Sequence, residues 1–204
     1  MTTLFWPSAL PNNQTPQFDA IGSGDETASG SWTHDPASGA YVLAILYVYP
    51  VVAPAPQFGS TAMSLLGNHT DPEGIGFYFY GLSGVAAGSQ TITYTTQTAC
   101  AGNSISLTGV ASVGSPTFQD QSSTESGSQT VDCSTGQIIV QSFEDGDFQA
   151  ITSYSGGTGQ YLGNRNNNPG QGNLTISTAL VNTTFNVSLD TIDSFTGGYV
   201  ILTG

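Results

Sequence analysis

The feature that most constrains this chain is a series of short apolar runs that recur roughly every ten residues. The runs are rich in Val, Ile, Thr, Tyr and Phe, and clusters of Gly, Pro, Asn and Ser separate them. We find no window with the i, i+3, i+4, i+7 apolar spacing of an amphipathic helix. The pattern predicts an all-β fold, a jelly-roll-like antiparallel β-sandwich in a single domain.

The predicted strands are 31–35, 41–49, 61–68, 75–82, 90–96, 104–111, 128–133, 137–144, 149–154, 159–164, 173–180, 183–190 and 197–204. The segment 41–49, YVLAILYVY, is apolar on both faces, which predicts a central strand. In QTITYTT, Ile92 and Tyr94 share one face, and NLTISTAL at 173–180 alternates apolar with polar residues. These two segments are predicted to bury one face and expose the other.

The stretch FGSTAMSLLGN, residues 58–68, has two interpretations. It is either a site that uses Ser60 or Met63, or a hairpin. We favour the hairpin, because Gly59 supplies the positive φ that a two-residue turn requires. Met63 and Leu65 are then predicted to point together into the core.

The first 25 residues are rich in Pro, Asn and Gln and have no clear strand pattern. We therefore expect an extended N-terminal arm at 1–25 and a β-sandwich domain at 26–204. An arm that cannot build its own core is expected to clasp a neighbouring subunit.

The chain is almost devoid of positive charge. It contains no lysine, Arg165 is its only Lys or Arg, and its formal net charge is −13. Such a surface is repelled by nucleic-acid phosphates and by anionic lipids, so we expect no nucleic-acid partner and no membrane-surface binding. Only 7% of residues are charged, which suits packing against copies or partner subunits.

The N-terminal sequence lacks the basic and apolar regions of a signal peptide. The longest apolar run is interrupted by Pro50, Pro54 and Pro56 and is too short to span a bilayer. We therefore expect a soluble protein without membrane insertion, which leaves its cell by a route such as lysis if it acts outside.

The sequence FEDGDF provides the densest carboxylate cluster, with Glu144, Asp145 and Asp147. Three carboxylates on a flexible loop suit a hard cation such as Ca²⁺. The alternative is an acidic turn between two strands, and we expect no bound cofactor beyond this weak calcium candidate. Paired carboxylates also serve glycoside hydrolysis, but nothing else in the chain points to catalysis.

The only two histidines lie near carboxylates, in THDP (His34, Asp35) and in NHTDPEG (His69, Asp71, Glu73). Such residues could contribute to a metal site or to a Ser-His-Asp triad. No G-x-S-x-G motif accompanies them, and Asp-Pro-x-Gly is typical of a turn. We favour the structural interpretation and predict no catalytic residue.

The loop NRNNNPGQGN, residues 164–173, contains the single arginine. We expect Arg165 to pair with a carboxylate of the domain or of a neighbouring subunit. The alternative is that the asparagines bind sugar hydroxyls. The contact-loop candidates are Asn164, Arg165, Asn166, Asn167 and Asn168.

The two cysteines, Cys100 and Cys133, have no spacing typical of zinc. If the strands between them form one long hairpin, both cysteines lie at its open end, where a disulfide is stereochemically feasible. The alternative is two buried thiols.

Four stretches together resemble a known family: SWTHDPASGAYVLAILYV, FGSTAMSLLGN, GFYFYGLSGVAAGSQTITYT and NSISLTGVASVGSPT. They are similar to minor tail proteins of tailed bacteriophages that infect mycobacteria and related actinobacteria, over about residues 31–143. The resemblance implies a β-sandwich, jelly-roll-like domain in the phage particle. It says more about fold than about task, because these are packing and turn motifs.

Three hypotheses for function follow. The first is a non-enzymatic virion protein of the phage tail tip or baseplate. It would bind other virion proteins and copies of itself as a homo-oligomer and possess a surface for host attachment, for example to a cell-surface glycan. It would be assembled in the host cytoplasm. The second is a capsid decoration protein. The third is a carbohydrate-binding module of an adhesin, which requires exposed aromatic rings, whereas Trp32 is predicted to face the core.

Overall fold

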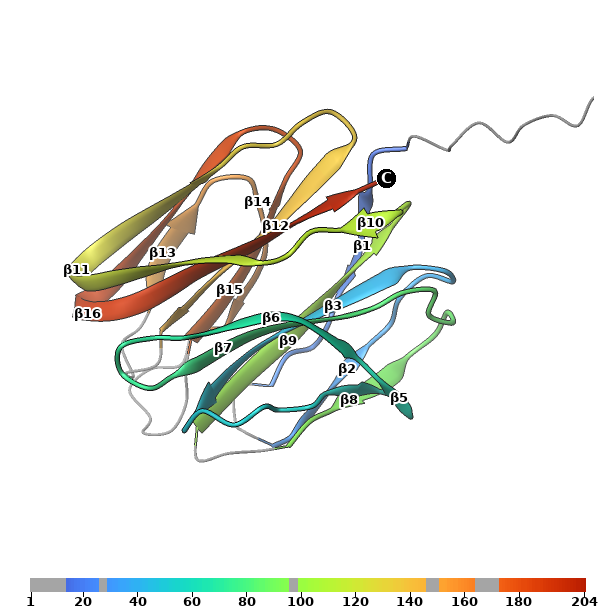
Figure 1. Ribbon diagram of the computed structural model, residues 1–204, viewed down its shortest axis with the longest axis horizontal. Coiled ribbons are helices and arrows are strands. Elements are labelled where there is room, and N and C mark those ends of the chain that lie inside the picture. Colours follow the sequence, from blue (N-terminus) through green and yellow to red (C-terminus); the bar gives the residue numbers. More distant parts are fainter. Residues whose placement is uncertain (1–13, 26–28, 96–98, 146–150, 164–172) are drawn as a thin grey trace, which may run out of the picture.

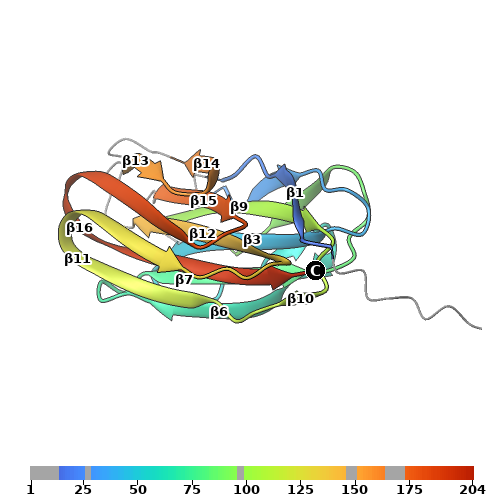
Figure 2. The ribbon, with the colours of Figure 1, turned by 90° about the horizontal axis from the view of Figure 1, so that it is seen from above.

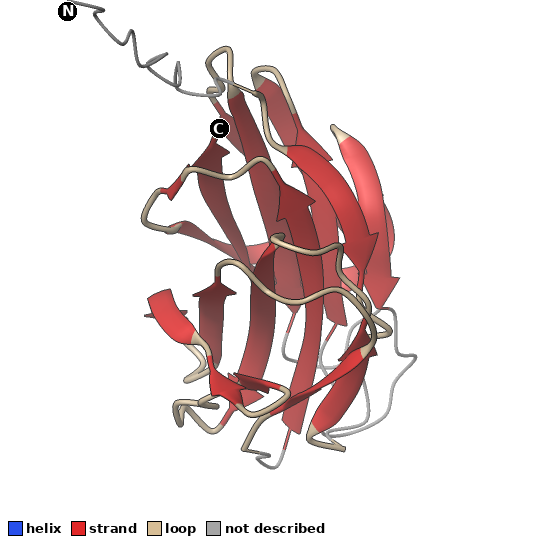
Figure 3. Ribbon diagram, turned by 90° about the vertical axis from the view of Figure 1, so that its right-hand side faces the viewer, coloured by secondary structure: helices blue, strands red, loops and turns tan. Residues whose placement is uncertain are grey.

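The computed structural model describes residues 14–25, 29–95, 99–145, 151–163 and 173–204. These residues form an all-β, sandwich-like single domain, which confirms the predicted fold class. All paired strands are antiparallel, and Figure 3 shows them stacked in layers without helices among the described residues. In the described part of the chain, no helix is long and apolar enough to cross a membrane.

Three sheets make up the domain (Figure 1). The five-stranded sheet contains, in spatial order, β1 (Gln17–Ile21), β9 (Ala99–Thr108), β3 (Tyr41–Tyr49), β7 (Gly76–Leu82) and β6 (Ser64–Thr70). The four-stranded sheet contains β2 (Ser31–His34), β8 (Gln90–Thr93), β4 (Gln57–Phe58) and β5 (Thr61–Ala62). The seven-stranded sheet contains β10 (Ser112–Val113), β16 (Thr183–Thr203), β12 (Gln137–Asp145), β15 (Asn173–Ala179) and β14 (Thr158–Gly163), and β11 (Thr117–Val131) and β13 (Ile151–Ser155) also pair with β16.

Strand β3 separates two hydrophobic cores. Successive side chains of a strand point to opposite faces. Val42, Ala44 and Leu46 therefore join one cluster, which includes Trp32 of the four-stranded sheet. Leu43 and Ile45 join another, which contains side chains of the seven-stranded sheet. The predicted central strand is thus confirmed, and the five-stranded sheet has another sheet packed on each face.

A third core lies on the far side of β12, where the seven-stranded sheet curls over itself. The C-terminal half of β16 pairs with β12 on one edge and with β10 and the first part of β11 on the other, while its N-terminal half pairs with the rest of β11 and with β13. Figure 2 shows β11 and β16 curving together along the edge of the molecule. This curl encloses Phe143, Phe185 and Phe195. The single sandwich predicted from the sequence therefore has more layers than its strand pattern indicated.

The β4–β5 hairpin and strand β15 confirm some local expectations and correct others. Gly59 has φ 59° in the tight β4–β5 turn, and Met63 is buried, as predicted. The prediction for Leu65 is wrong, because an irregularity between Leu65 and Gly67 leaves this side chain 49% exposed. The one-sided burial predicted for 173–180 is also wrong, since β15 lies between β12 and β14 and is buried on both faces.

Part of the segment predicted as an arm is a strand of the sandwich. Gln17–Ile21 forms β1, an edge strand that pairs with β9, and Asp25 bridges to Gly102. Residues 14–25 therefore belong to the sandwich, because the β9 edge offers them backbone hydrogen bonds. Residues 1–13 lie outside the described residues.

The predicted Cys100–Cys133 disulfide is wrong. It assumed that the strands between the cysteines form one hairpin, whereas β9 pairs with β1 and β3, and β11 pairs with β16. The chain crosses between sheets at this point. Cys100 is buried in the core beside the four-stranded sheet, and Cys133 packs against the third core, so no bond joins these two described sulfurs.

Candidate functional site

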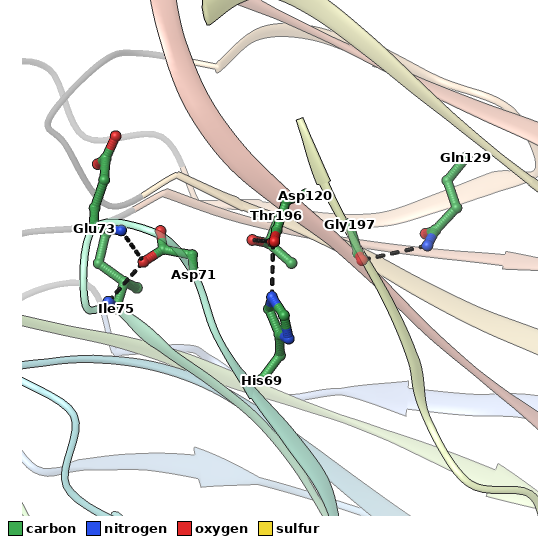
Figure 4. A network of polar contacts seen from close by, with 8 residues as sticks. All are labelled: His69, Asp71, Glu73, Ile75, Asp120, Gln129, Thr196 and Gly197. Carbon is green, nitrogen blue, oxygen red and sulfur yellow. Dashed lines mark hydrogen bonds and ion pairs between the residues drawn. The ribbon is translucent and has the colours of Figure 1, made fainter. Parts of the chain in front are cut away.

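A polar cluster lies between the five-stranded and seven-stranded sheets (Figure 4). His69 of β6 places its Nε2 atom 2.8 Å from Oδ1 of Asp120 on β11, and the Thr196 hydroxyl donates to the same oxygen at 2.9 Å. The His69 ring also stacks on Phe118, with 5.6 Å between ring centroids. This half-exposed contact joins the two sheets at their edges.

Asp71 organises the turn between β6 and β7. Its Oδ1 atom accepts hydrogen bonds from the backbone nitrogens of Glu73 (3.0 Å) and Ile75 (2.7 Å). Gly74 follows with φ 84°. The Asp-Pro-x-Gly segment is therefore the turn that the sequence predicts. Burial raises the pKa of Asp71, and these backbone donors act in the opposite direction.

Glu144 lies deeper, near the end of β12. Its side chain is fully buried, and neither carboxylate oxygen has a hydrogen-bond partner among the described residues. Burial raises the pKa of Glu144 well above its ordinary value, and the nearby Asp71 and Asp145 carboxylates raise it further. The Thr196 side chain acts in the opposite direction and lowers this pKa, although its hydroxyl donates to Asp120.

The calcium candidate does not form the expected loop. Glu144 and Asp145 are strand residues of β12, and Asp147 lies outside the described residues. Adjacent strand residues point to opposite faces, so two neighbouring carboxylates on β12 diverge rather than converge on one ion. Within the described ranges, no group of three His, Cys, Asp or Glu side chains is arranged to hold a metal.

His34 belongs to a buried chain of polar contacts between the four-stranded and five-stranded sheets. Trp32 Nε1 donates to Ser104 Oγ at 2.8 Å, and Ser104 Oγ lies 2.9 Å from His34 Nδ1. Burial lowers the pKa of His34 to about 4, although Asp19 and Asp35 act to raise it. His34 is 2% exposed and Ser104 is fully buried, so this Ser-His pair lies inside the domain rather than at its surface.

Asp25 is the polar residue whose importance the sequence pattern did not indicate. Its carboxylate accepts hydrogen bonds from the backbone nitrogens of Ser29 (3.2 Å), Gly30 (2.8 Å) and Ser31 (3.2 Å). The hydroxyls of Ser29 (2.9 Å) and Tyr94 (2.8 Å) also donate to it. An Asp a few residues before a Gly and Ser run is the only local signal of such a clasp.

An apolar groove of about 550 Å³ lies between β1 and the β14–β15 pair. It is lined by Pro16, Gln17, Phe18, Ile138, Gly157, Thr158, Gln160, Thr178, Ala179, Leu180, Val181 and Thr183. Not one of these lining residues is charged. Three of them are large apolar side chains left open to solvent: Phe18 (40% exposed), Leu180 (48%) and Val181 (67%).

The remaining candidates are scattered. His34 and His69 lie on β2 and β6 and contact different partners, so the structure does not bring the two histidines into one site. The contact-loop candidates, Asn164 to Asn168 with Arg165, lie outside the described residues. Trp32 is 3% exposed, which confirms that it faces the core.

Comparisons with known proteins add little. No family model matches the chain, and no curated protein matches it. Among solved structures, the chain is similar to a conserved protein of unknown function from Pseudomonas aeruginosa PAO1, with 8% sequence identity and a TM-score of 0.31. The alignment covers 93% of this chain and 100% of the other. A likeness at this level carries no argument about function.

Proposed function

We propose that this chain is a non-enzymatic structural protein of a tailed-phage particle, a minor component of the tail tip or baseplate. The observation that carries the proposal is the uncharged groove beside β1, with Phe18, Leu180 and Val181 exposed on a chain of net charge −13. Exposed apolar surface of this kind marks contact sites between proteins. The resemblance of its sequence motifs to phage minor tail proteins is the reason for placing the chain in a phage particle.

The buried polar groups agree with a structural role. His34, Ser104 and Glu144 are suited to acid–base or nucleophilic chemistry, but all three are nearly or fully buried, and the half-exposed His69 is held by Asp120 and Phe118. A catalytic group must come within hydrogen-bond reach of its substrate. The alternative of a carbohydrate-binding module is less well supported, because Trp32 is buried and cannot form a sugar platform.

The test is to locate the chain in purified particles of the phage that encodes it. We expect its peptides in the mass spectrum of the purified particles, and gold-labelled antibody at the tail tip. Label spread over the head would favour the capsid decoration alternative. Particles that lack the chain altogether, with the protein left in the lysate, would refute a structural role.

A further inference from the structure

We propose that the groove between β1 and the β14–β15 pair binds the N-terminal segment, residues 4–10, of a second copy of this chain. The inference rests on the proposed assembly role, to which it adds the identity of one partner. Its physical basis is a match between the surface of the groove and the chemistry of this one segment.

The groove selects an uncharged apolar ligand. Its volume of about 550 Å³ lies within the range of roughly 300–1,000 Å³ of small ligand pockets, so it accommodates a few side chains rather than a whole domain face. Because no lining residue is charged, a basic partner would gain nothing here and would be drawn to the acidic surface elsewhere. An acidic partner would be repelled by the net charge of the protein.

The segment 4–10 has the required composition. It reads LFWPSAL, and neither it nor the rest of residues 1–18 contains a charged side chain. It holds Leu4, Phe5, Trp6 and Leu10 within seven residues, including one of only two tryptophans in the chain. Burying one such apolar side chain contributes about 1.5–3 kcal/mol. Left in water, this segment would be an unusually apolar stretch for so polar a protein.

The path of the chain favours a neighbour over the same molecule. Pro16 lines the groove, and the two described residues before it run beside the C-terminus and away from β14 and β15 in both views (Figure 1, Figure 2). Docking into its own groove would require residues 11–13 to reverse this direction. The 13 residues before Gln14 can span roughly 45 Å when extended, enough to reach another subunit. Such an arm exchange closes into a two-fold dimer when it is reciprocal, and builds rings or filaments when each copy binds a different neighbour.

The experiment measures self-association of the full chain by sedimentation over a range of concentrations. The groove variant is Leu180→Ser with Val181→Ser, the segment variant is Trp6→Ser, and Ile192→Ser is the control. Ile192 is 63% exposed and does not line the groove. We expect the wild type and the control to associate alike, and each test variant to raise the dissociation constant about tenfold or more.

Mixing the two test variants gives the sharpest outcome. The groove variant still offers its segment, and the segment variant still offers its groove. We therefore expect the mixture to form a one-to-one complex although neither variant associates alone. Association of the segment variant at wild-type strength would overturn the proposal, because another surface would then carry the contact.

Fluorescence separates the remaining possibility, in which the segment occupies the groove of its own molecule. Trp6 is read in a Trp32→Phe background as the only tryptophan. We expect Trp6 to be shielded from acrylamide at high concentration and exposed on dilution. Shielding that persists in the monomer overturns the proposal, and so does a lack of shielding at every concentration.

Two checks keep these outcomes interpretable. Far-ultraviolet circular dichroism verifies the fold of each variant, and Val181→Ser alone, at the most exposed lining position, replaces the groove variant if that one misfolds. The purified chain is the only material used. Its failure to associate therefore leaves a detection in phage particles standing, and its absence from particles leaves a measured association standing.

Discussion

Two carboxylates lie at similar depth in this protein, yet their surroundings are opposite. Asp25, beside the four-stranded sheet, is 3% exposed and accepts hydrogen bonds from three backbone nitrogens and two hydroxyls. Glu144, between the other two sheets, is fully buried, and its oxygens have no partner within the described residues. Depth of burial alone therefore does not determine how a buried acid affects stability. The effect depends on the hydrogen-bond donors around the carboxylate, because they replace the hydrogen bonds to water that burial removes.

This difference gives the two inter-sheet regions different roles. The Asp25 clasp fixes the start of β2 and ties it to Tyr94, just beyond the end of β8. The Glu144 region instead gathers carboxylates from β12 and from the β6–β7 turn without opposing charge among the described groups that surround it. We infer that the first region is held mainly by hydrogen bonds, and the second by apolar packing that tolerates a protonated acid.

Removal of the Asp25 clasp has the largest expected effect. Asp25→Ala leaves several buried or half-buried donors without an acceptor, so we expect a loss of about 3–5 kcal/mol in the free energy of unfolding. Urea denaturation at pH 7 measures it. Asp132→Ala, at an exposed carboxylate, is the control and should change stability by less than about 0.5 kcal/mol. Equal effects of the two substitutions would show that the clasp contributes nothing.

The features that depend on local sequence pattern were predictable from the sequence. The nine apolar residues of β3 indicated a strand buried on both faces, and Gly59 indicated its turn. Asp25 and Glu144 could not be distinguished in the same way. The donors to Asp25 come from residues 4–6 and 69 positions away, whereas the described residues provide none for Glu144. Which donors reach a carboxylate depends on strand pairing, which local sequence does not show.

The failed predictions share one cause. The prediction assumed that β9 and β11 form a hairpin, which is the shortest connection available. The chain instead crosses to another sheet, so Cys100 and Cys133 lie in different cores and are not bonded. The expectation that Glu144 and Asp145 lie on a loop is wrong, because strand β12 continues through Asp145. Non-local strand pairing overrides local composition in both places.

Protonation of the buried His34 has the next largest expected effect on the free energy of unfolding. The pKa of His34 is about 4 in the folded state against 6.5 as its ordinary value, so the unfolded chain binds more protons between these limits. Its contribution is therefore complete above pH 6.5 and falls as the pH drops to about 4, by roughly 3 kcal/mol in total. Denaturation at a series of pH values measures this slope.

His34→Asn tests the assignment, because it removes the titrating ring while an amide can still face Ser104. We expect the variant to lose the acid-side slope. His69→Asn, at the half-exposed histidine, should retain it. If the slope survives in His34→Asn, protonation of some other group destabilises the protein in acid.

Glu144 has the opposite dependence on pH. Because its pKa is raised in the folded state, the folded protein holds a proton that the unfolded chain has released, and stability falls as the pH rises above the ordinary value near 4.5. Glu144→Gln removes this penalty. We expect the variant to be more stable than the wild type by about 1–3 kcal/mol at pH 7, with the gain shrinking toward pH 4.

Glu125→Gln is the matched control for this substitution, since Glu125 is exposed on β11. It should leave stability within about 0.5 kcal/mol at every pH. A loss of stability in Glu144→Gln at pH 7 would contradict the comparison, because it would mean that Glu144 is ionised and paired. Non-additivity with Arg165→Gln would then identify the cation.

The smallest expected effect belongs to the His69–Asp120 contact, which spans the same two sheets as Glu144 but near the solvent. Half-exposed ion pairs contribute little, because water competes for both groups and salt screens their attraction. A double-mutant cycle with His69→Ala and Asp120→Ala should give a coupling energy below about 1 kcal/mol, and a smaller one in high salt. Thr196 also donates to Asp120, so the cycle is best repeated in Thr196→Val. A coupling energy above about 2 kcal/mol that does not change with salt concentration would mean that water is excluded from this pair. The boundary between the two sheets would then be held by polar contacts, as the Asp25 region is, and the contrast between the regions would be lost.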